Sequence, residues 1–449
     1  MDTNLQGLTM YPIIFACRVS DISPSLAAAY GYNRSCSYRQ VTTCWEMKAS
    51  KHYQYGAHLL VDPTQTLARV KPFMPAMGIT RIANVTGLDR TGIPVVMVCR
   101  PNSHSIAVSQ GKGFTLDAAK ASGLMESIES WHAERIELPL KLGNFDDLSL
   151  GHPMINIDRL PAMRDSLYHS KLPILWVEGT NLVDKTSVWL PYETVHTYYA
   201  HPAPSGSGCF AQSSNGLASG NHYLEAVSHA ICECVERDST SLWHHKSKQE
   251  RNDTKLDLNS VDDEICCQLI ARLQAANLTV TVWDTTSDSG IPSFDCVLLD
   301  PRQALTHPGL GAGCHPCKSI ALARALTEAA QVRTTYIAGS RDDLTHREFK
   351  PTELKQKNRL LRGMAGSNSG VIDFTSIVDR QFATFEEDVD WMLAQLGNIG
   401  IDEVVCVDLS KPAFDIPVVR VVIPGLEGPH DEDDYIPGPR ASATVEQAR

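Results

Sequence analysis

Acidic residues recur at the spacing of one helix face in residues 116–135, which we predict to be helical. Ser122, Glu126 and Glu129 share this face, because successive residues of a helix advance by about 100°. Thr115 is a suitable N-cap for the helix. The opposite face is apolar and should meet the core; it consists of Ala121, Leu124, Ile128 and Trp131.

A second helix, predicted over residues 223–244, repeats this plan. Its glutamates lie within about a quarter turn of one another, and its apolar residues gather on the far side. The polar residues in and beside this helix are Asn221, Glu225, Glu233, Glu236 and Arg237.

Two acidic helix faces would form a cation site if they opposed each other. Five carboxylates in one cleft cannot all stay ionised unless positive charge neutralises them. Mg²⁺ prefers oxygen ligands, takes few carboxylates and completes its shell with water and phosphates. Both helices follow glycine-rich stretches, residues 111–113 and 213–220, which suit the entrance of a nucleotide site. The alternative is that the glutamates are solvated surface residues, and the sequence alone leaves this open.

A third helix, predicted over residues 319–337, adds positive charge. Arg333 lies on its apolar face, where an unpaired charge would be costly. Either a phosphate or a buried carboxylate would pair with it, and guanidinium geometry suits both. The polar stripe of this helix consists of Arg324, Glu328, Gln331 and Thr335.

Shorter elements must position these three helices. Further helices are predicted over residues 66–77 and 385–396, and residues 345–365 are predicted to be a loop or a short helix. Strands are predicted over residues 79–85, 93–100, 174–177, 187–190, 278–283, 296–299, 404–408 and 418–423. This mixture predicts an α/β (α+β) fold with mixed or antiparallel sheets and long flanking helices that carry a carboxylate cleft.

Composition argues against several classes of protein. The 449 residues carry a net charge of −12, which is unusual for a protein that binds duplex nucleic acid. No stretch approaches the ~18 apolar residues of a membrane span, and no secretory signal is evident. The thirteen cysteines are odd in number and irregularly spaced, which favours reduced thiols. We therefore expect a cytoplasmic protein without nucleic-acid or membrane partners.

The two ends of the chain differ from its middle. Residues 1–50 lack clear periodicity and are predicted to be an N-terminal extension, either disordered or upstream of a true start at Met47. Residues 51–440 are assigned to one domain. Residues 441–449 are predicted to be a frayed tail.

Three ordered stretches resemble the signatures of YcaO-domain proteins. They are GKGFTLDAAKASGLMESIESWHAER at residues 111–135, SSNGLASGNHYLEAVSHAICECVERDS at 213–239 and GLGAGCHPCKSIALARALTEAAQVRTTYIAGSRDD at 309–343. The resemblance implies a YcaO-type ATP-binding fold for residues 51–440. It also implies an ATP- and Mg²⁺-dependent enzyme that activates a peptide backbone amide through its carbonyl oxygen.

The resemblance also implies roles for individual residues. Arg81 and Lys112 are further candidates for nucleotide contact. The implied metal ligands are Glu126, Glu129, Glu225, Glu233 and Glu236. The implied nucleotide-binding residues are Ser122, Asn221, Glu225, Arg237, Gln331 and Arg333. The implied catalytic residues are Arg237, Arg324 and Arg333.

Both ends of the domain resemble the stand-alone YcaO proteins that work with a TfuA partner. The resemblance is carried by TLARVKPFMPAMGITRIANVTGLDRTGIPVVMVCRP near the start, and by VVRVVIPGLEG followed by YIPGPRA near the end. It implies thioamide formation on a peptide or protein substrate, with a TfuA-like protein as partner. Azoline-forming members often end in a proline-rich PxPxP tail, whereas Pro437-Gly438-Pro439 is followed here by ten more residues.

Other functions stay open at this point. An azoline-forming cyclodehydratase of a ribosomal peptide would use the same ATP site. An accessory factor in ribosomal-protein methylthiolation would bind without catalysing. A homodimer is also left open by the sequence.

Overall fold

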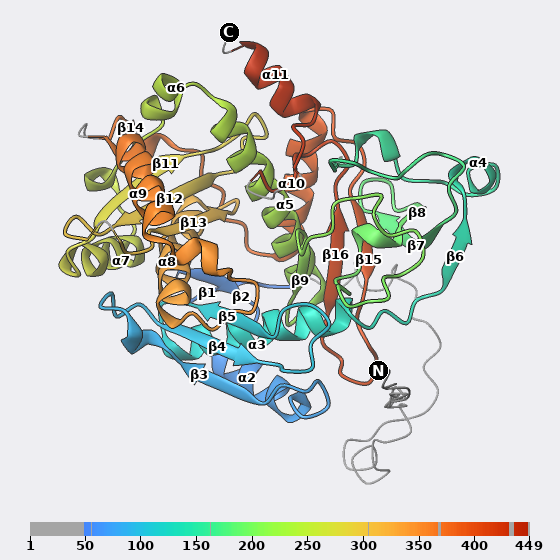
Figure 1. Ribbon diagram of the computed structural model, residues 1–449, viewed down its shortest axis with the longest axis horizontal. Coiled ribbons are helices and arrows are strands. Elements are labelled where there is room, and N and C mark those ends of the chain that lie inside the picture. The colour runs from blue at the N-terminus through green and yellow to red at the C-terminus, as the bar shows by residue number, and fades with distance from the viewer. Residues whose placement is uncertain are drawn as a thin grey trace, which may run out of the picture. The chain divides into compact units, whose positions relative to one another are not determined.

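Three antiparallel assemblies of strands each support one long helix in the computed structural model (Figure 1). The structure describes residues 49–54, 56–161, 163–303, 305–366, 370–430 and 435–447, which belong to one compact unit. The predicted extension, residues 1–50, lies outside the described residues except for Ala49 and Ser50.

The first sheet has the order β3-β4-β5 and carries α3. Its strands are β3 (Arg81–Asn84), β4 (Val95–Cys99) and β5 (Val108–Lys112), and the helix is α3 (Leu116–Ala133). Thr115 caps α3 by accepting a hydrogen bond from the backbone N–H of Ala118, as predicted. Leu124 and Ile128, on the apolar face of the helix, are fully buried.

The second sheet has the order β11-β12-β13 and carries α8. Its elements are β11 (Thr279–Asp284), β12 (Ser293–Leu299), β13 (Gly309–Cys314) and α8 (Lys318–Ala338). Glycines along β13 let the helix backbone approach closely: a Cβ on Gly311 would lie 2.2 Å from the backbone nitrogen of Ala329, and one on Gly313 would lie 2.1 Å from the carbonyl oxygen of Ala321. The repeated glycines of this segment therefore set the position of α8.

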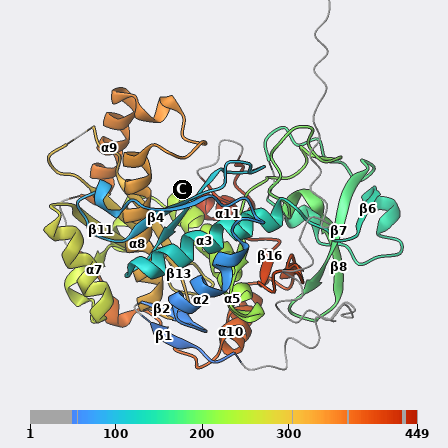
Figure 2. The same ribbon diagram turned by 90° about the horizontal axis from the view of Figure 1, so that it is seen from below.

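The third sheet is the largest and supports α5 (Tyr223–His245), which packs on β9 and β16. Its order is β6-β7-β15-β16-β9, with β8 paired to β7. The strands are β6 (Leu140–Gly143), β7 (Ile174–Asn181), β8 (Ser187–Pro191), β9 (Leu217–Ser219), β15 (Val405–Asp408) and β16 (Val418–Val422). In Figures 1 and 2, α5 lies between this sheet and the β11–β13 sheet.

The remaining elements are short or peripheral. The strands β1 (His52–Gln54) and β2 (Ala57–Leu59) form a hairpin, and β10 (Leu256–Asp257) pairs with β14 (Ile372–Asp373). The other helices are α2 (Pro63–Val70), α4 (Phe145–Leu148), α6 (Lys248–Asp253), α7 (Glu264–Ala275), α9 (Pro351–Ala365), α10 (Phe385–Asn398) and α11 (Pro439–Gln447). None of the described helices is long and apolar enough to cross a bilayer.

Two predicted elements differ from the structure. Residues 345–365 include α9, a helix of 15 residues, rather than a loop or a short helix. The predicted frayed tail after residue 440 is instead helical through Gln447. Ala441 is fully buried and donates its backbone N–H to Glu427 Oε1 at 2.9 Å, which explains why this segment is held in place.

Candidate functional site

A large cavity of about 2060 Å³ lies where the polar faces of α3, α5 and α8 meet. The five glutamates predicted to share a cleft all line it, and so do Ser122, Asn221, Arg237, Arg324 and Gln331. The helices turn their apolar faces toward their own sheets, so the polar faces are left for the cavity. The polar faces of the three helices therefore line one shared cavity and are not separate solvent-exposed surfaces.

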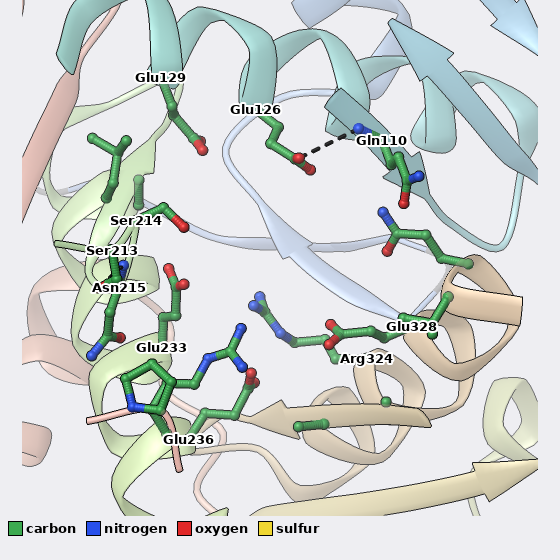
Figure 3. A pocket seen from close by; sticks show the side chains of 18 of the residues that line it. Gln110, Glu126, Glu129, Ser213, Ser214, Asn215, Glu233, Glu236, Arg324 and Glu328 are labelled. Atoms are coloured by element: carbon green, nitrogen blue, oxygen red, sulfur yellow. Dashed lines mark hydrogen bonds between the residues drawn. The ribbon is translucent and has the colours of Figure 1, made fainter. Parts of the chain in front are cut away.

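Two carboxylates reach the cavity from α3 (Figure 3). Glu126 Oε1 accepts a hydrogen bond from the backbone N–H of Gln110 at 3.3 Å. Glu129 Oε1 accepts from the backbone N–H and hydroxyl of Ser219, at 2.9 and 2.6 Å. Each of these contacts involves a single oxygen, Oε1. Among the described residues, no hydrogen bond to the second oxygen of either carboxylate is seen.

Glu233 and Glu236 reach the cavity from α5, on the side facing Glu126 and Glu129 (Figure 3). Glu236 is 4% exposed, and its Oε2 has no hydrogen-bond partner among the described residues. Glu225 differs from both, because its oxygens accept the backbone N–H groups of Leu60 and Asn221 at 3.3 and 2.6 Å. Glu225 therefore braces the chain before α2 and α5, and a metal ion would compete with these two bonds.

Basic groups line the cavity beside these acids. Arg324 of α8 contacts His229 of α5 through Nη1, and its Nε has no partner among the described residues. Glu328, one turn further along α8, forms an ion pair with Lys112 at the end of β5. Arg237 and Arg324 thus face the same space as Glu233 and Glu236.

Burial and mutual repulsion perturb the acids of this cavity. Burial raises the pKa of Glu129 to about 8, and the charges of Glu126 and Glu233 add to this effect. Burial likewise raises the pKa of Glu236 to about 7, with Glu328 contributing. For Glu328 itself burial acts in the same direction, but Lys112 and Arg237 outweigh it and lower the pKa. Glu328 has an ion-paired cation that outweighs burial, whereas for Glu129 and Glu236 burial dominates.

These residues fit Mg²⁺ and a nucleotide. Four carboxylates on two facing helices supply oxygen ligands, and the unpartnered Glu236 Oε2 and the raised pKa values show that positive charge is needed there. The neighbouring guanidinium groups of Arg237 and Arg324 suit phosphate oxygens.

Two predicted residues lie elsewhere. Arg333 does not line the cavity; its Nε donates to Asp89 Oδ2 at 2.8 Å, and its Nη1 donates to the carbonyl of His307. Both side chains of the Arg333–Asp89 pair are buried. Of the two partners that the sequence left open for Arg333, the structure therefore shows the carboxylate. The predicted catalytic and nucleotide-binding roles of Arg333 do not agree with this position. Arg81 is exposed on β3 and also lies outside the cavity lining.

The sequence did not single out several cavity residues. His229 was missed, although it lies midway between Glu225 and Glu233 at i±4 and so on the same helix face. Arg420 interrupts the apolar strand β16, and that interruption was the available signal. Asp295 and Arg341 also line the cavity, and no local pattern marks them.

Comparison with known proteins places this site in a family. The family model described as YcaO cyclodehydratase, ATP- and Mg²⁺-binding, matches residues 110–427. An uncharacterized protein from the tfuA 3′ region of Rhizobium leguminosarum bv. trifolii is 34% identical over 374 residues, which are 82% of this chain and 88% of that protein.

Solved structures show the same fold at low sequence identity. A heterocyclase in complex with substrate and cofactor has a TM-score of 0.72 and 21% identity, over 86% of this chain and 55% of its own. The YcaO protein of Methanopyrus kandleri, bound with AMPPCP and Mg²⁺, has a TM-score of 0.68 and 22% identity, over 87% of this chain and all of its own. The predicted fold class is therefore confirmed.

Proposed function

Since the chain belongs to the YcaO family, we propose that it activates a peptide backbone amide at the expense of ATP, and that the product is a thioamide. ATP and Mg²⁺ are the cofactors that the family description gives. The observation that carries the proposal is the convergence of the polar faces of α3, α5 and α8 on one cavity. We propose that the protein acts in the cytoplasm.

We assign different residues of the cavity to binding of the metal and of the phosphates. We assign the metal to Glu126, Glu129, Glu233 and Glu236, whose carboxylates lack full partners. Mg²⁺-ATP, when bound, supplies the phosphoryl group that makes the amide oxygen a leaving group. Arg237 and Arg324 neutralise phosphate charge. Placing such groups in a protein cavity strengthens their electrostatic effect, because water no longer screens them.

We propose that Glu225 and Asn221 hold the backbone at the start of α5 and do not bind the metal directly. Asn221 Oδ1 accepts the hydroxyl of Thr66 at 3.1 Å, and its backbone N–H is held by Glu225. These contacts fix the start of α5 against α2, so that the two residues shape the nucleotide end of the cavity. Ser122 and Gln331 line the same cavity from α3 and α8.

Two observations support a thioamide product. The relative from the tfuA 3′ region matches this chain over 88% of its own length, which associates the sequence with a TfuA-like partner. Residues 437–439 are Pro-Gly-Pro and lead into α11, which differs from the PxPxP pattern of azoline-forming members. In this reaction a sulfide equivalent would attack the amide carbonyl carbon, and the carbonyl oxygen would take the phosphoryl group and leave as phosphate.

Azoline formation is the second candidate. The family description names cyclodehydratases, and there the nucleophile would be a Cys, Ser or Thr side chain of the substrate. The same cavity would serve both reactions, because only the nucleophile differs.

Mass spectrometry of a candidate precursor peptide distinguishes these products. The peptide is incubated with the protein, a TfuA-like partner, ATP and sulfide. Exchange of oxygen for sulfur supports thioamide formation, whereas loss of one water supports azoline formation. Neither product, together with no use of ATP, would favour an accessory role.

A further inference from the structure

A buried guanidinium that forms no ion pair within the described part of the chain lies beside the carboxylates of the cavity. Arg420, on β16, is 4% exposed and lines the cavity. Its Nε donates to the carbonyl of Thr194 at 3.0 Å, and its buried Nη1 has no hydrogen-bond partner among the described residues. No described carboxylate forms an ion pair with it. A buried charge in this state is costly unless a ligand pairs with it.

Two further polar groups that have no partner among the described residues line the same cavity as Arg420. The strand register places Arg420 opposite Leu217 of β9, and Asn215 lies two residues before Leu217. Asn215 Oδ1 is a buried acceptor, and Thr197 Oγ1 is a buried hydroxyl; neither has a partner among the described residues. Both residues line the same cavity. A donor on Arg420 and an acceptor on Asn215, both without partners among the described residues, therefore lie along one wall formed by β16 and the start of β9.

This wall adjoins the proposed metal ligands. Asn215 and Glu233 line the same cavity, and Ser219, which holds Glu129, lies on the same strand as Leu217. The charges of Arg237 and Arg420 oppose the effect of burial on the pKa of Glu233, so Arg420 is close enough to act on it.

We propose that Arg420 and Asn215 bind the backbone amide of the acceptor peptide, with the carbonyl oxygen toward Arg420 and the amide N–H toward Asn215 Oδ1. The inference rests on the proposed function, since it takes the acceptor to be a peptide. A peptide group offers one acceptor and one donor, which is the complement of this wall. A phosphate offers acceptors only and would face Asn215 Oδ1 unfavourably.

The charge of Arg420 also suits the reaction. The amide oxygen becomes more negative as the nucleophile adds to the carbonyl carbon, and a guanidinium placed beforehand stabilises that charge without reorganising. Arg420 keeps its protons throughout, because its role is to donate hydrogen bonds. The amide is thereby held with its oxygen toward the metal and phosphate side of the cavity.

The first test is stability, compared with a paired arginine of equal burial. Arg420→Met removes a buried charge that forms no ion pair with any described carboxylate, so we expect the melting temperature to rise by on the order of 2 °C. Arg100 is 2% exposed and binds both oxygens of Glu134, at 2.5 and 2.6 Å, so Arg100→Met should lower the melting temperature. If Arg420→Met lowers it as Arg100→Met does, then Arg420 is a structural residue and the proposal is wrong.

The second test is binding of a peptide that offers backbone amides and no side chains. Pentaglycine is titrated by NMR into the protein saturated with Mg²⁺-ADP. We expect Arg420→Met and Asn215→Ala to weaken pentaglycine binding about tenfold each, while Mg²⁺-ADP affinity stays within about twofold. If the two variants bind pentaglycine as the unaltered protein does, the subsite is wrong but the proposed function is not affected. The same holds if the variants lose binding of inorganic phosphate and keep binding of pentaglycine. Failure of the unaltered protein to bind Mg²⁺-ADP would instead overturn the proposed function.

Discussion

Binding of Mg²⁺-nucleotide should release protons from the cavity, and the amount can be worked out from its acids. A metal-binding carboxylate must be ionised, so metal and proton compete for it. With pKa values of about 8 for Glu129 and about 7 for Glu236, these two groups together carry about 1.4 protons at pH 7. Burial also raises the pKa values of Glu126 and Glu233, so these two acids add to the release.

The release is measured by isothermal titration calorimetry of Mg²⁺-ADP in buffers of different ionisation enthalpy. Glu129→Gln should release about one proton fewer than the unaltered protein at pH 7. Glu137→Gln is the matched control, because the Glu137 side chain is 71% exposed and lies outside the cavity lining. Release near zero, or equal release by Glu129→Gln and the unaltered protein, would refute the assignment of these acids to the metal.

The same pKa values determine how the stability of the fold and the affinity for Mg²⁺-ADP change with pH. A carboxyl whose folded pKa is raised stabilises the fold at pH values below its unfolded pKa, and this contribution is lost as the pH rises through its folded pKa. The metal-free protein should therefore become less stable between about pH 5 and 8, and Mg²⁺-ADP should reverse this loss. Affinity for Mg²⁺-ADP should rise over the same range and level off above it.

Three further predictions concern single residues and the product. Glu126→Gln or Glu233→Gln should abolish ATP turnover while circular dichroism shows an intact fold, because both side chains face the cavity and not the core; retained turnover would contradict their assignment. Arg333→Met should destabilise the fold by about 3–5 kcal/mol in urea unfolding, because it leaves Asp89 buried and unpaired, and it should not change Mg²⁺-ADP affinity. The modified peptide should show exchange of oxygen for sulfur by mass spectrometry, and loss of water would exclude the thioamide.

The long helices could be predicted from the sequence because their periodicity is local. The bounds of α3, α5 and α8 agree with the prediction to within two residues. The predicted helix over 66–77 agrees less well: α2 begins earlier, at Pro63, and ends at Val70. Pro72 explains the early end, since it lacks the N–H that would continue the helix.

The partners of charged residues could not be predicted, because they are distant in sequence. An arginine on the apolar face of α8 requires an anion, but nothing near Arg333 indicates that Asp89, 244 residues away, supplies it. Arg420 shows the same limit, since the sequence does not indicate that its Nη1 is buried without a partner among the described residues. The pattern of one helix predicts a face, and the packing of several helices decides what that face meets.

The most direct test of amide activation follows the oxygen atom of the substrate amide. A candidate precursor peptide labelled with heavy oxygen at the modified amide is incubated with the protein, its TfuA-like partner, ATP and sulfide, and the released phosphate is analysed by mass spectrometry. The account predicts that the label appears in phosphate in proportion to the amides modified. Modified peptide with unlabelled phosphate would contradict it.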